Sequence, residues 1–347
     1  MAATQDMASA SKSGEDCNPP CVAVTGASGH LGANLVRALL ADGRRVRVLV
    51  RQSTQGIAGL PVEVVRADVL DRPSLDAAFA GVGTVFHLAA KVSAGWEPTK
   101  LVTQVNVLGT RNVLQACLGA GVRRLVHFSS IQALAPAAGA KLVEETCPLV
   151  ASAHPQRGAY DVAKAAAEQL VLDASAGGLD AVILNPTAVV GPFDFQPSPM
   201  GELLLALARG RLPALVSRAR HDFVDVRDVA TAALAAERRG RRGERYLLPG
   251  ARLSVVELAA KWAEVTGRAA PRLVAPMWLA RIAAPFAPGW ARVRGRRPRF
   301  TSDSLRMLRR SLPVTRAKAE RELGYRPRPI EETLRDTWAW MQTAGRS

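Results

Sequence analysis

Tyr160 and Lys164 are spaced so that they could perform acid–base chemistry together. They stand four residues apart in a stretch with helical spacing, 160–174, so both side chains project from one face of a helix. A tyrosine hydroxyl has an ordinary pKa of ~10, and a neighbouring ammonium lowers that pKa by stabilising the phenolate. The spacing therefore predicts a tyrosine that gives or takes a proton near neutral pH.

Ser130 is the third candidate for this chemistry. It lies just after the apolar residues of a predicted strand, 125–128, which ends in Ser129 and Ser130, and a hydroxyl there could polarise a carbonyl or hold an alcohol oxygen. The order along the chain supports a catalytic role, because a glycine-rich turn is followed by Ser129 and Ser130 and then by Tyr160 and Lys164. Together these residues indicate reversible hydride transfer between a nicotinamide cofactor and a small-molecule carbonyl or alcohol.

A glycine-rich turn between the first predicted strand and helix indicates dinucleotide binding. Gly26 permits a tight turn, Gly29 lets a pyrophosphate approach the backbone, and Gly32 lets the helix pack on the strand. The amides at the helix start would then face the phosphates. The residues expected to bind the cofactor here are Gly26, Ser28, Gly29, His30, Leu31 and Gly32.

The end of the second predicted strand, 46–50, favours NADP(H) over NAD(H). NAD sites commonly have an acidic residue there, which binds the ribose 2′-hydroxyl, whereas this chain has Arg51. A guanidinium can form paired hydrogen bonds with a 2′-phosphate. The alternative is that Arg51 is only a surface residue at a strand end.

Two more strand ends supply candidate cofactor contacts by their position alone. Asp68 and Val69 follow the third strand and are expected near the adenine. Ala89, Ala90 and Lys91 follow the fourth strand and are expected beside the nicotinamide.

The elements that must position these residues alternate along residues 20–185. Near-continuous apolar strands separated by amphipathic helices predict an α/β, Rossmann-type, doubly wound parallel sheet. The expected strands are 22–25, 46–50, 62–66, 84–88, 125–128 and 181–184, and the expected helices are 31–41, 73–80, 101–119 and 160–174.

Residues 186–347 predict a smaller, mostly helical substrate-binding part that can return strands to the main sheet. Its expected helices are 202–209, 226–238, 255–266 and 316–323. Residues 1–19 are small and polar and predict a disordered tail.

The formal net charge of +16 arises after residue 200, where Arg dominates the basic residues. Such a charge could favour an anionic substrate, a membrane surface or a nucleic acid. The dense clusters at 238–245 and 292–299 lie beside loop signals, and only 5% of the residues are aromatic, so we favour a solvated surface and expect no nucleic-acid partner.

The sequence also limits the location and cofactors of the protein. No apolar stretch is long and uncharged enough to span a membrane, although 276–290 could line an apolar pocket or contact a membrane surface if it is not simply core. The four cysteines have no metal-site spacing, so we expect no metal and a reducing, cytoplasmic setting.

The chain resembles the extended short-chain dehydrogenases/reductases of the NAD-dependent epimerase/dehydratase superfamily, specifically the dihydroflavonol 4-reductase-like branch. That branch also contains 3β-hydroxysteroid dehydrogenase-like proteins and a sugar epimerase group. The likeness covers residues 21–340 and rests on Val24-Thr25-Gly26-Ala27-Ser28-Gly29-His30-Leu31-Gly32, Asn106-Val107-Leu108-Gly109-Thr110, His127-Phe128-Ser129-Ser130, Tyr160-Asp161-Val162-Ala163-Lys164, Asn185-Pro186-Thr187-Ala188-Val189-Val190-Gly191-Pro192-Phe193, Phe223-Val224-Asp225-Val226-Arg227-Asp228-Val229-Ala230 and Arg321-Glu322-Leu323-Gly324-Tyr325-Arg326-Pro327.

The resemblance implies roles for particular residues. Ser130, Tyr160 and Lys164 would form the catalytic triad, and Lys164 would also bind the nicotinamide ribose. Asn106 would support the active-site framework, and Pro186 and Thr187 would border the nicotinamide. Dimers are common in this family, which makes a homodimer a further expectation.

Departures from the family pattern restrict the reaction. Sugar dehydratases of this superfamily have a pair of acids where this chain has Ile131 and Gln132, which argues against a dehydratase. Ala135 stands where plant dihydroflavonol reductases contact their substrate, so flavonoid specificity does not follow. A nucleotide-sugar epimerase with tightly bound NAD is the alternative to a reductase. A cofactor-sensing protein without catalysis is least favoured, because the triad is whole.

Overall fold

The computed structural model describes residues 21–93, 97–152, 157–212, 214–216, 220–271, 273–275 and 312–345. The expected tail at 1–19, the apolar stretch at 276–290 and the basic cluster at 292–299 lie outside the described residues.

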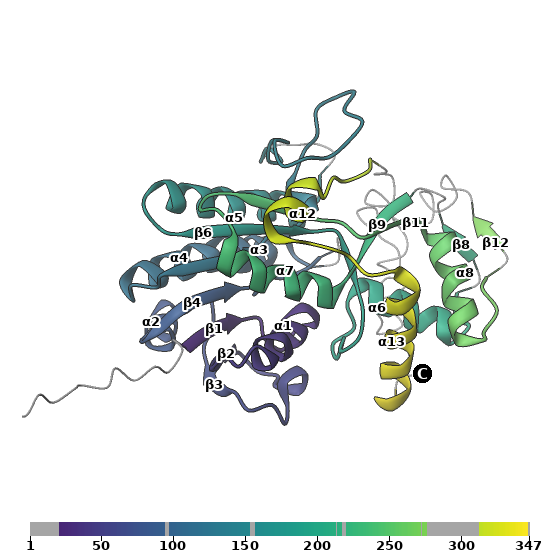
Figure 1. The fold of residues 1–347 in the computed structure, drawn as a ribbon, viewed down its shortest axis with the longest axis horizontal. Coiled ribbons are helices and arrows are strands. Elements are labelled where there is room, and N and C mark those ends of the chain that lie inside the picture. Colours follow the sequence, from purple (N-terminus) through teal and green to yellow (C-terminus); the bar gives the residue numbers. More distant parts are fainter. Residues whose placement is uncertain are drawn as a thin grey trace, which may run out of the picture.

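Seven parallel strands form the main sheet, in the order β10-β6-β5-β4-β1-β2-β3 (Figure 1). The order reverses between β1 and β4, and in such sheets ligands bind at this switch point, beyond the carboxyl ends of the strands. The strands are β1 (Cys21–Thr25), β2 (Val46–Val50), β3 (Glu63–Arg66), β4 (Val82–His87), β5 (Arg124–Phe128), β6 (Ala181–Pro186) and β10 (Arg245–Leu248).

Helices cover both faces of this sheet, which explains why its central strands are nearly continuous apolar runs. Alternate residues of β1 face opposite layers: Val22 and Val24 join one core cluster and Ala23 joins the other. One layer contains α1 (His30–Ala41), α7 (Val226–Arg239) and α12 (Ala317–Leu323), and the other contains α2 (Arg72–Phe79), α4 (Gly109–Gly119) and α5 (Ala159–Ala176). The predicted α/β doubly wound fold is confirmed.

The helix expected over 101–119 is interrupted. It consists of α3 (Thr99–Thr103), a π-helical turn (Gln104–Leu108) and then α4. Such wide turns are frequent at functional sites, and this one carries Asn106. The apolar period of the sequence does not distinguish it from an ordinary helical turn.

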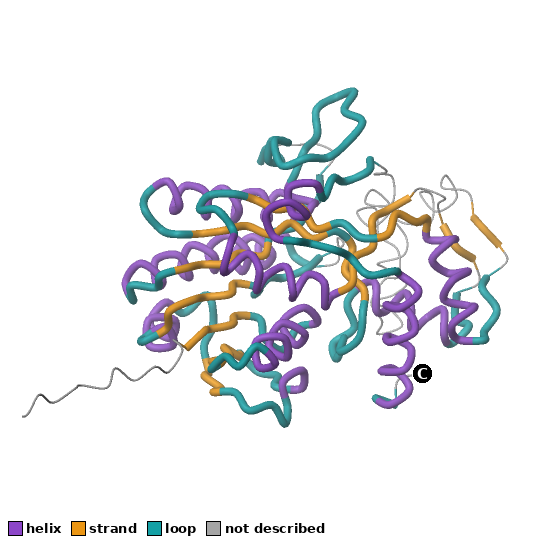
Figure 2. Tube along the Cα trace, in the orientation of Figure 1, coloured by secondary structure: helices purple, strands orange, loops and turns teal. Residues whose placement is uncertain are grey.

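The chain beyond β6 contributes more strands than the sequence indicated. Two small sheets, β11-β9-β7 and β12-β8, accompany the helices there (Figure 2). These elements are β7 (Ala188–Val190), α6 (Pro199–Ala208), β8 (Ala214–Val216), β9 (Arg220–Asp225), β11 (Ala251–Ser254), α8 (Val255–Thr266), β12 (Leu273–Ala275) and α13 (Ile330–Thr343).

This later part of the chain also completes the main sheet. β10 pairs with β6, so a strand does return to the sheet, and α7 packs against α1. Residues on both sides of the predicted boundary at 185/186 therefore build the same layered core.

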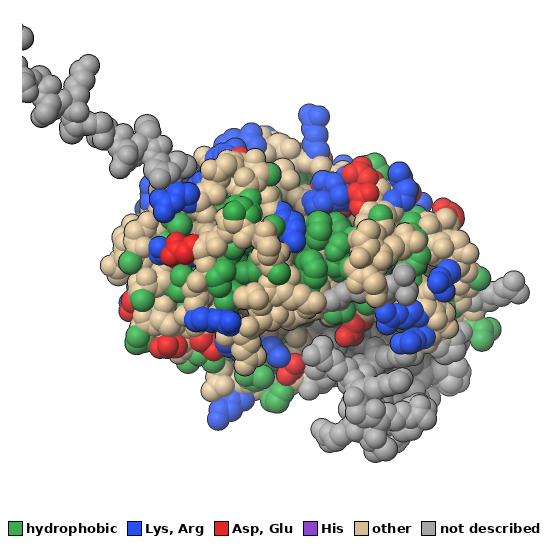
Figure 3. All heavy atoms as spheres, turned by 90° about the horizontal axis from the view of Figure 1, so that it is seen from below, with side chains coloured by type: hydrophobic (Ala, Val, Ile, Leu, Met, Phe, Trp, Pro, Cys, Tyr) green, Lys and Arg blue, Asp and Glu red, His purple; other side chains and the backbone are tan. Residues whose placement is uncertain are grey.

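The surface and the helices bear on possible partners. On the face seen in Figure 3, Lys and Arg side chains stand in small groups separated by apolar and uncharged side chains. None of the helices in the described part of the chain is both long and apolar enough to cross a membrane.

Candidate active site

The glycines of the first turn are required for different reasons. Gly26 has a φ of +71°, and a Cβ there would lie 2.7 Å from the Ala89 nitrogen. A Cβ at Gly32 would lie 2.2 Å from the Gly26 carbonyl oxygen. The packing of the chain on itself therefore explains both of these glycines.

Gly29 has no such internal reason. Its φ is −76°, and a Cβ there would lie at an ordinary distance of 3.4 Å from the Gly26 oxygen. No side chain of the described residues caps α1 at this end, so its first backbone N–H groups are available to a ligand. A bare Cα beside free amides fits the close approach of a dinucleotide pyrophosphate.

The ends of β2 and β3 carry exposed arginines beside this turn. Arg51 is exposed, and Arg66 donates from Nη1 to the carbonyls of Arg51 (3.3 Å) and Gln52 (2.8 Å). A short 3₁₀ turn (Gln55–Ile57) links this region to the glycine loop, because a Cβ at Gly56 would lie 2.8 Å from the Ser28 oxygen. Arg66 was not identified from the sequence.

A buried hydrogen-bond chain joins the ends of β1 and β4 to α4. The Thr110 hydroxyl donates to the Asn106 carbonyl (2.7 Å), so it accepts from His87 Nε2 (3.0 Å). His87 Nδ1 then accepts from the Thr25 hydroxyl (2.8 Å). Burial lowers the pKa of His87 to about 3, so its ring is neutral, as this chain of bonds requires.

This hydrogen-bond chain fixes the turn that follows β4. The Thr25 hydroxyl oxygen accepts from the backbone nitrogens of Leu88 (3.2 Å) and Ala89 (3.1 Å). At the other end of the turn, Asn106 accepts from the Lys91 nitrogen (2.7 Å) and donates to its carbonyl (3.1 Å). The turn expected beside the nicotinamide, Ala89 to Lys91, is therefore held from both sides.

The structure brings Ser130, Tyr160 and Lys164 together. The side chains of Ser130 and Tyr160 are close enough for Ser130 to influence the pKa of the phenol, and both residues are partly exposed. Lys164, one helical turn after Tyr160, is only 5% exposed and donates from Nζ to the Phe128 carbonyl (2.7 Å). Ser130 also begins a 3₁₀ turn (Ile131–Ala133), where its hydroxyl accepts from the Gln132 nitrogen (3.2 Å).

The electrostatics of Tyr160 differ from the expectation. Burial raises its pKa, the Asp161 carboxylate raises it further, and the hydrogen bond from Ser130 opposes them. The predicted lowering by Lys164 is therefore wrong for this structure, because burial of the phenol outweighs the other influences. Tyr160 is protonated at neutral pH.

Lys164 keeps its charge at neutral pH in spite of its burial. Burial lowers its pKa to about 8, and the Glu168 carboxylate acts in the opposite direction. The Lys164 side chain is therefore mainly an ammonium up to about pH 8.

The remaining predicted cofactor residues lie at the same edge of the sheet, and several are held by other parts of the chain. His30 Nε2 lies 3.1 Å from the carbonyl oxygens of Gly191 and Pro192, so its ring contacts the later part of the chain, while Leu31 packs against the core. Asp68 accepts from the Leu70 nitrogen (3.0 Å).

Val69, Pro186 and Thr187 are positioned by backbone contacts. The Val69 carbonyl accepts from the Asn112 side chain (2.9 Å), which ties the turn after β3 to α4. Pro186 ends β6, and the Thr187 nitrogen donates to the Leu248 carbonyl (3.3 Å).

Sequence reasoning missed the buried polar residues that support the site. Thr25 and His87 each end an apolar strand, Asn185 is the last residue but one of β6, and Glu168 follows Lys164 by one helical turn. A buried polar residue at the carboxyl end of an apolar strand was the available signal.

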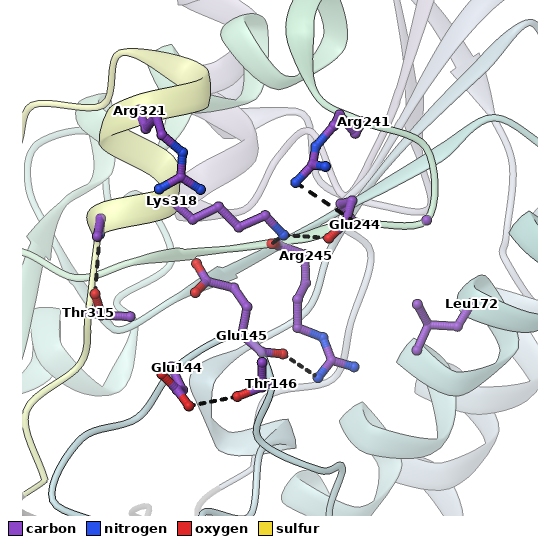
Figure 4. A pocket seen from close by; sticks show the side chains of 12 residues that line it. Glu144, Glu145, Thr146, Leu172, Arg241, Glu244, Arg245, Thr315, Lys318 and Arg321 are labelled. Atoms are coloured by element: carbon purple, nitrogen blue, oxygen red, sulfur yellow. Dashed lines mark hydrogen bonds and ion pairs between the residues drawn. The ribbon is translucent and has the colours of Figure 1, made fainter.

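A separate hollow of about 540 Å³ lies at the amino end of β10 (Figure 4). Its charged side chains largely pair with each other or with nearby groups, as Lys318 does with Glu244 (2.5 Å). It lies at the opposite end of the sheet from Ser130, so we do not assign the chemistry to it. Among the described residues, no group of three or more His, Cys, Asp or Glu side chains is placed to hold a metal.

Alanine at Gly32 should impair stability, whereas alanine at Gly29 should impair cofactor binding. Gly32→Ala forces a Cβ into the Gly26 carbonyl and should lower the free energy of unfolding by more than about 2 kcal/mol. Gly29→Ala should keep the stability and weaken dinucleotide binding at least about tenfold, because only the ligand needs that space. Urea unfolding and cofactor titration measure the two effects; equal loss of stability in both variants would contradict this division.

Lys164→Met should stabilise the protein at pH 7. The folded-state pKa of Lys164 is lowered to about 8, so its burial costs stability below that pH, and the cost fades as pH rises towards the unfolded pKa of ~10.4. After the loss of one hydrogen bond, a gain of about 2 kcal/mol remains at pH 7 and shrinks by pH 10. Urea unfolding at both pH values tests this; a variant less stable at pH 7 would refute it.

Comparison with known proteins identifies the family. The profile described as "NAD dependent epimerase/dehydratase family" matches residues 22–248. "Sterol demethylase protein B" of Methylococcus capsulatus is 40% identical over 328 residues, which are 93% of this chain and 98% of that protein. A Synechocystis protein provisionally named dihydroflavonol 4-reductase is 35% identical over 336 residues, covering 94% and 95% of the two chains.

A solved structure supports the same conclusion. A nucleoside-diphosphate-sugar epimerase of Pseudomonas aeruginosa superposes with a TM-score of 0.78 and 26% identity, over 94% of this chain and 99% of that one. Members of the matched family use a nicotinamide cofactor. The chain therefore belongs to the NAD-dependent epimerase/dehydratase family, as an oxidoreductase of the extended short-chain dehydrogenase/reductase type with dihydroflavonol reductase-like relatives.

Proposed function

We propose that this protein interconverts a carbonyl and an alcohol by hydride transfer with NADP(H), using Ser130, Tyr160 and Lys164 as catalytic residues. The observation that carries the proposal is the arrangement of these three side chains at the end of β5. Tyr160 interacts with Ser130, and the buried Lys164 ammonium, one helical turn after Tyr160, is bound to the carbonyl of Phe128, two residues before Ser130. Relatives named as reductases and as a dehydrogenase support this type of reaction.

Each side chain has a distinct task in this proposal. The Ser130 hydroxyl donates a hydrogen bond to the substrate oxygen, and Tyr160 gives that oxygen its proton during reduction. The nicotinamide supplies the hydride. The raised pKa of Tyr160 favours reduction, because the residue is then a proton donor at neutral pH. Lys164 binds the ribose hydroxyls, and Asn106 holds the turn at Lys91.

The preference for NADP(H) rests on the arginines beside the glycine loop. Arg51 is exposed at the end of β2, and Arg66 crosses to the same backbone from the end of β3. Two guanidinium groups at this rim suit a 2′-phosphate. In the turn after β3, the Asp68 carboxylate accepts a hydrogen bond from the Leu70 nitrogen.

For the substrate we propose an apolar, polycyclic ketone or alcohol. The support comes from names: one relative is called a sterol demethylase protein, and another is called a 3β-hydroxysteroid dehydrogenase and isomerase. The direct screen tests a panel of 3-ketosteroids and simple aliphatic ketones as substrates. Turnover is measured by the decrease in nicotinamide absorbance.

A nucleotide-sugar epimerase is the second candidate. The structural likeness to a nucleoside-diphosphate-sugar epimerase favours it. A bound NAD that never leaves would take the hydride from the sugar and return it, and the same Ser, Tyr and Lys would orient the sugar and move the proton. Arg51 at the end of β2 counts against it, because that position favours NADP(H) over the NAD of such enzymes.

Tyr160→Phe should keep cofactor affinity and lose at least about a thousandfold in kcat, because phenylalanine fills the same space without a proton to give. Ser130→Ala should fall less steeply, since it removes one hydrogen bond from the substrate oxygen. Cofactor titration and turnover with the best ketone of the panel separate binding from catalysis. Unchanged turnover in Tyr160→Phe would remove this residue from the mechanism.

Arg51→Asp should weaken NADPH binding by at least about tenfold and leave NADH almost unchanged, because only NADPH carries the 2′-phosphate. Arg45→Asp is a matched control: it makes the same charge change just before β2, at the opposite end of that strand. Equal weakening of both nucleotides, or an equal effect of the control, would show that Arg51 does not recognise the phosphate.

A further inference from the structure

Behind Ser130 lies a buried polar chain that the catalytic proposal does not use. Glu168 in α5 and Asn185 in β6 both have no exposed surface. The Asn185 side-chain nitrogen donates to Glu168 Oε2 (2.8 Å) and to the Ser130 carbonyl (3.2 Å). The backbone of the candidate catalytic serine is thereby linked to a carboxylate in the helix that carries Tyr160 and Lys164.

The series of buried polar contacts continues from Glu168 to Arg245, the first residue of β10. Its Nε lies 2.9 Å from Glu168 Oε1, and its Nη1 donates to the carbonyls of Glu145 (3.2 Å) and Cys147 (2.9 Å). Figure 4 shows this guanidinium directed towards Glu145 at the edge of the charged hollow. Glu168 is therefore fixed between two strands.

Glu168 is also placed to act on Lys164. It follows Lys164 by four residues and Tyr160 by eight, so the three side chains lie along one side of α5. A buried carboxylate is costly to keep unless it is paired and hydrogen-bonded, and here Arg245 and Asn185 meet both needs. Core packing alone does not require a charge at this place.

The other titratable groups near Lys164 do not supply a negative charge. His87 from β4 and His127 from β5 are buried, and burial lowers the pKa of each below its ordinary value, so both are neutral at pH 7. Tyr160 is protonated there. Within the described residues, Glu168 is the group whose charge favours the ammonium form of Lys164.

We propose that Glu168 is a positioning residue for the reaction, which keeps the positive charge on Lys164 and, through Asn185, holds Ser130 in place. The inference rests on the proposed function, because it assigns Glu168 a purpose only if Lys164 and Ser130 are catalytic. Glu168 itself touches neither substrate nor cofactor in this account.

The direct test is the titration of Lys164 itself. The titration is monitored by ¹³C NMR of labelled lysine side chains, and the Lys164 signal is assigned by its absence from Lys164→Met. In the unmodified protein the Lys164 signal should titrate near pH 8. In Glu168→Gln it should titrate at least about one pH unit lower, because the anion that favours the ammonium is gone. At pH 8 this shift reduces the fraction of Lys164 in the ammonium form to about a fifth of its original value. At pH 6 that fraction changes very little.

Two controls separate this effect from damage to the fold. Glu237→Gln neutralises another buried carboxylate paired with an arginine, Arg44, on the opposite face of the sheet, so it should cost stability and leave Lys164 unchanged. If Glu168→Gln does not fold, Glu168→Gln with Arg245→Met removes both partners and should recover stability. Lys164 should still titrate low in this double variant.

The outcomes also separate this inference from the proposed function, since the NMR titration needs no substrate. An unshifted Lys164 in a folded Glu168 variant overturns the positioning role, even if the protein reduces ketones. A lowered Lys164 titration in a protein that transfers no hydride supports the role of Glu168 on Lys164 and contradicts the proposed function. If the protein turns over a substrate, the pH at which kcat/KM falls on the alkaline side should decrease together with the pKa of Lys164. A merely structural role would lower activity equally at every pH.

Discussion

The hydrogen bond from the Lys164 ammonium to the Phe128 carbonyl is the interaction on which the site depends. It places a buried cation at the carboxyl end of β5, where Phe128 ends the strand. Burial of an ammonium is unfavourable unless nearby groups compensate. That requirement explains why a carbonyl and, one turn along α5, a carboxylate are found near the ammonium, and the surrounding imidazoles are kept neutral mainly by their own burial. Ser130, after this strand, and Tyr160, one helical turn before Lys164, interact through their side chains at the same edge of the sheet.

The other candidate site residues lie at the same edge of the sheet because all seven strands are parallel. Their carboxyl ends point one way, so the glycine turn after β1, the turn after β4 and Ser130 after β5 converge at the switch point. Buried hydroxyl and imidazole groups join these strand ends to each other and to a helix, as His87 at the end of β4 does with Thr25 of β1 and Thr110 of α4. The turns are therefore fixed by the core itself and not only by a bound ligand.

The sequence was sufficient for the residues whose chemistry depends on local spacing. The glycine turn and the Tyr160–Lys164 pair were predictable because a turn and a helix face are set by neighbours in the chain. Asn185 and Arg245 were not predictable as parts of the site, because their partners lie far away in sequence. The π-helical turn around Asn106 leaves the apolar pattern unchanged, and the raised pKa of Tyr160 depends on burial, which spacing alone does not give.

The central claim is that this site transfers hydride with an exchangeable NADP(H). The most direct measurement is to identify any nicotinamide nucleotide that stays with the purified protein, and then to titrate the stripped protein with NADPH and NADH. We expect NADPH to bind more tightly than NADH and to exchange freely with solution. Tightly retained NAD that resists exchange would contradict it and would favour the epimerase.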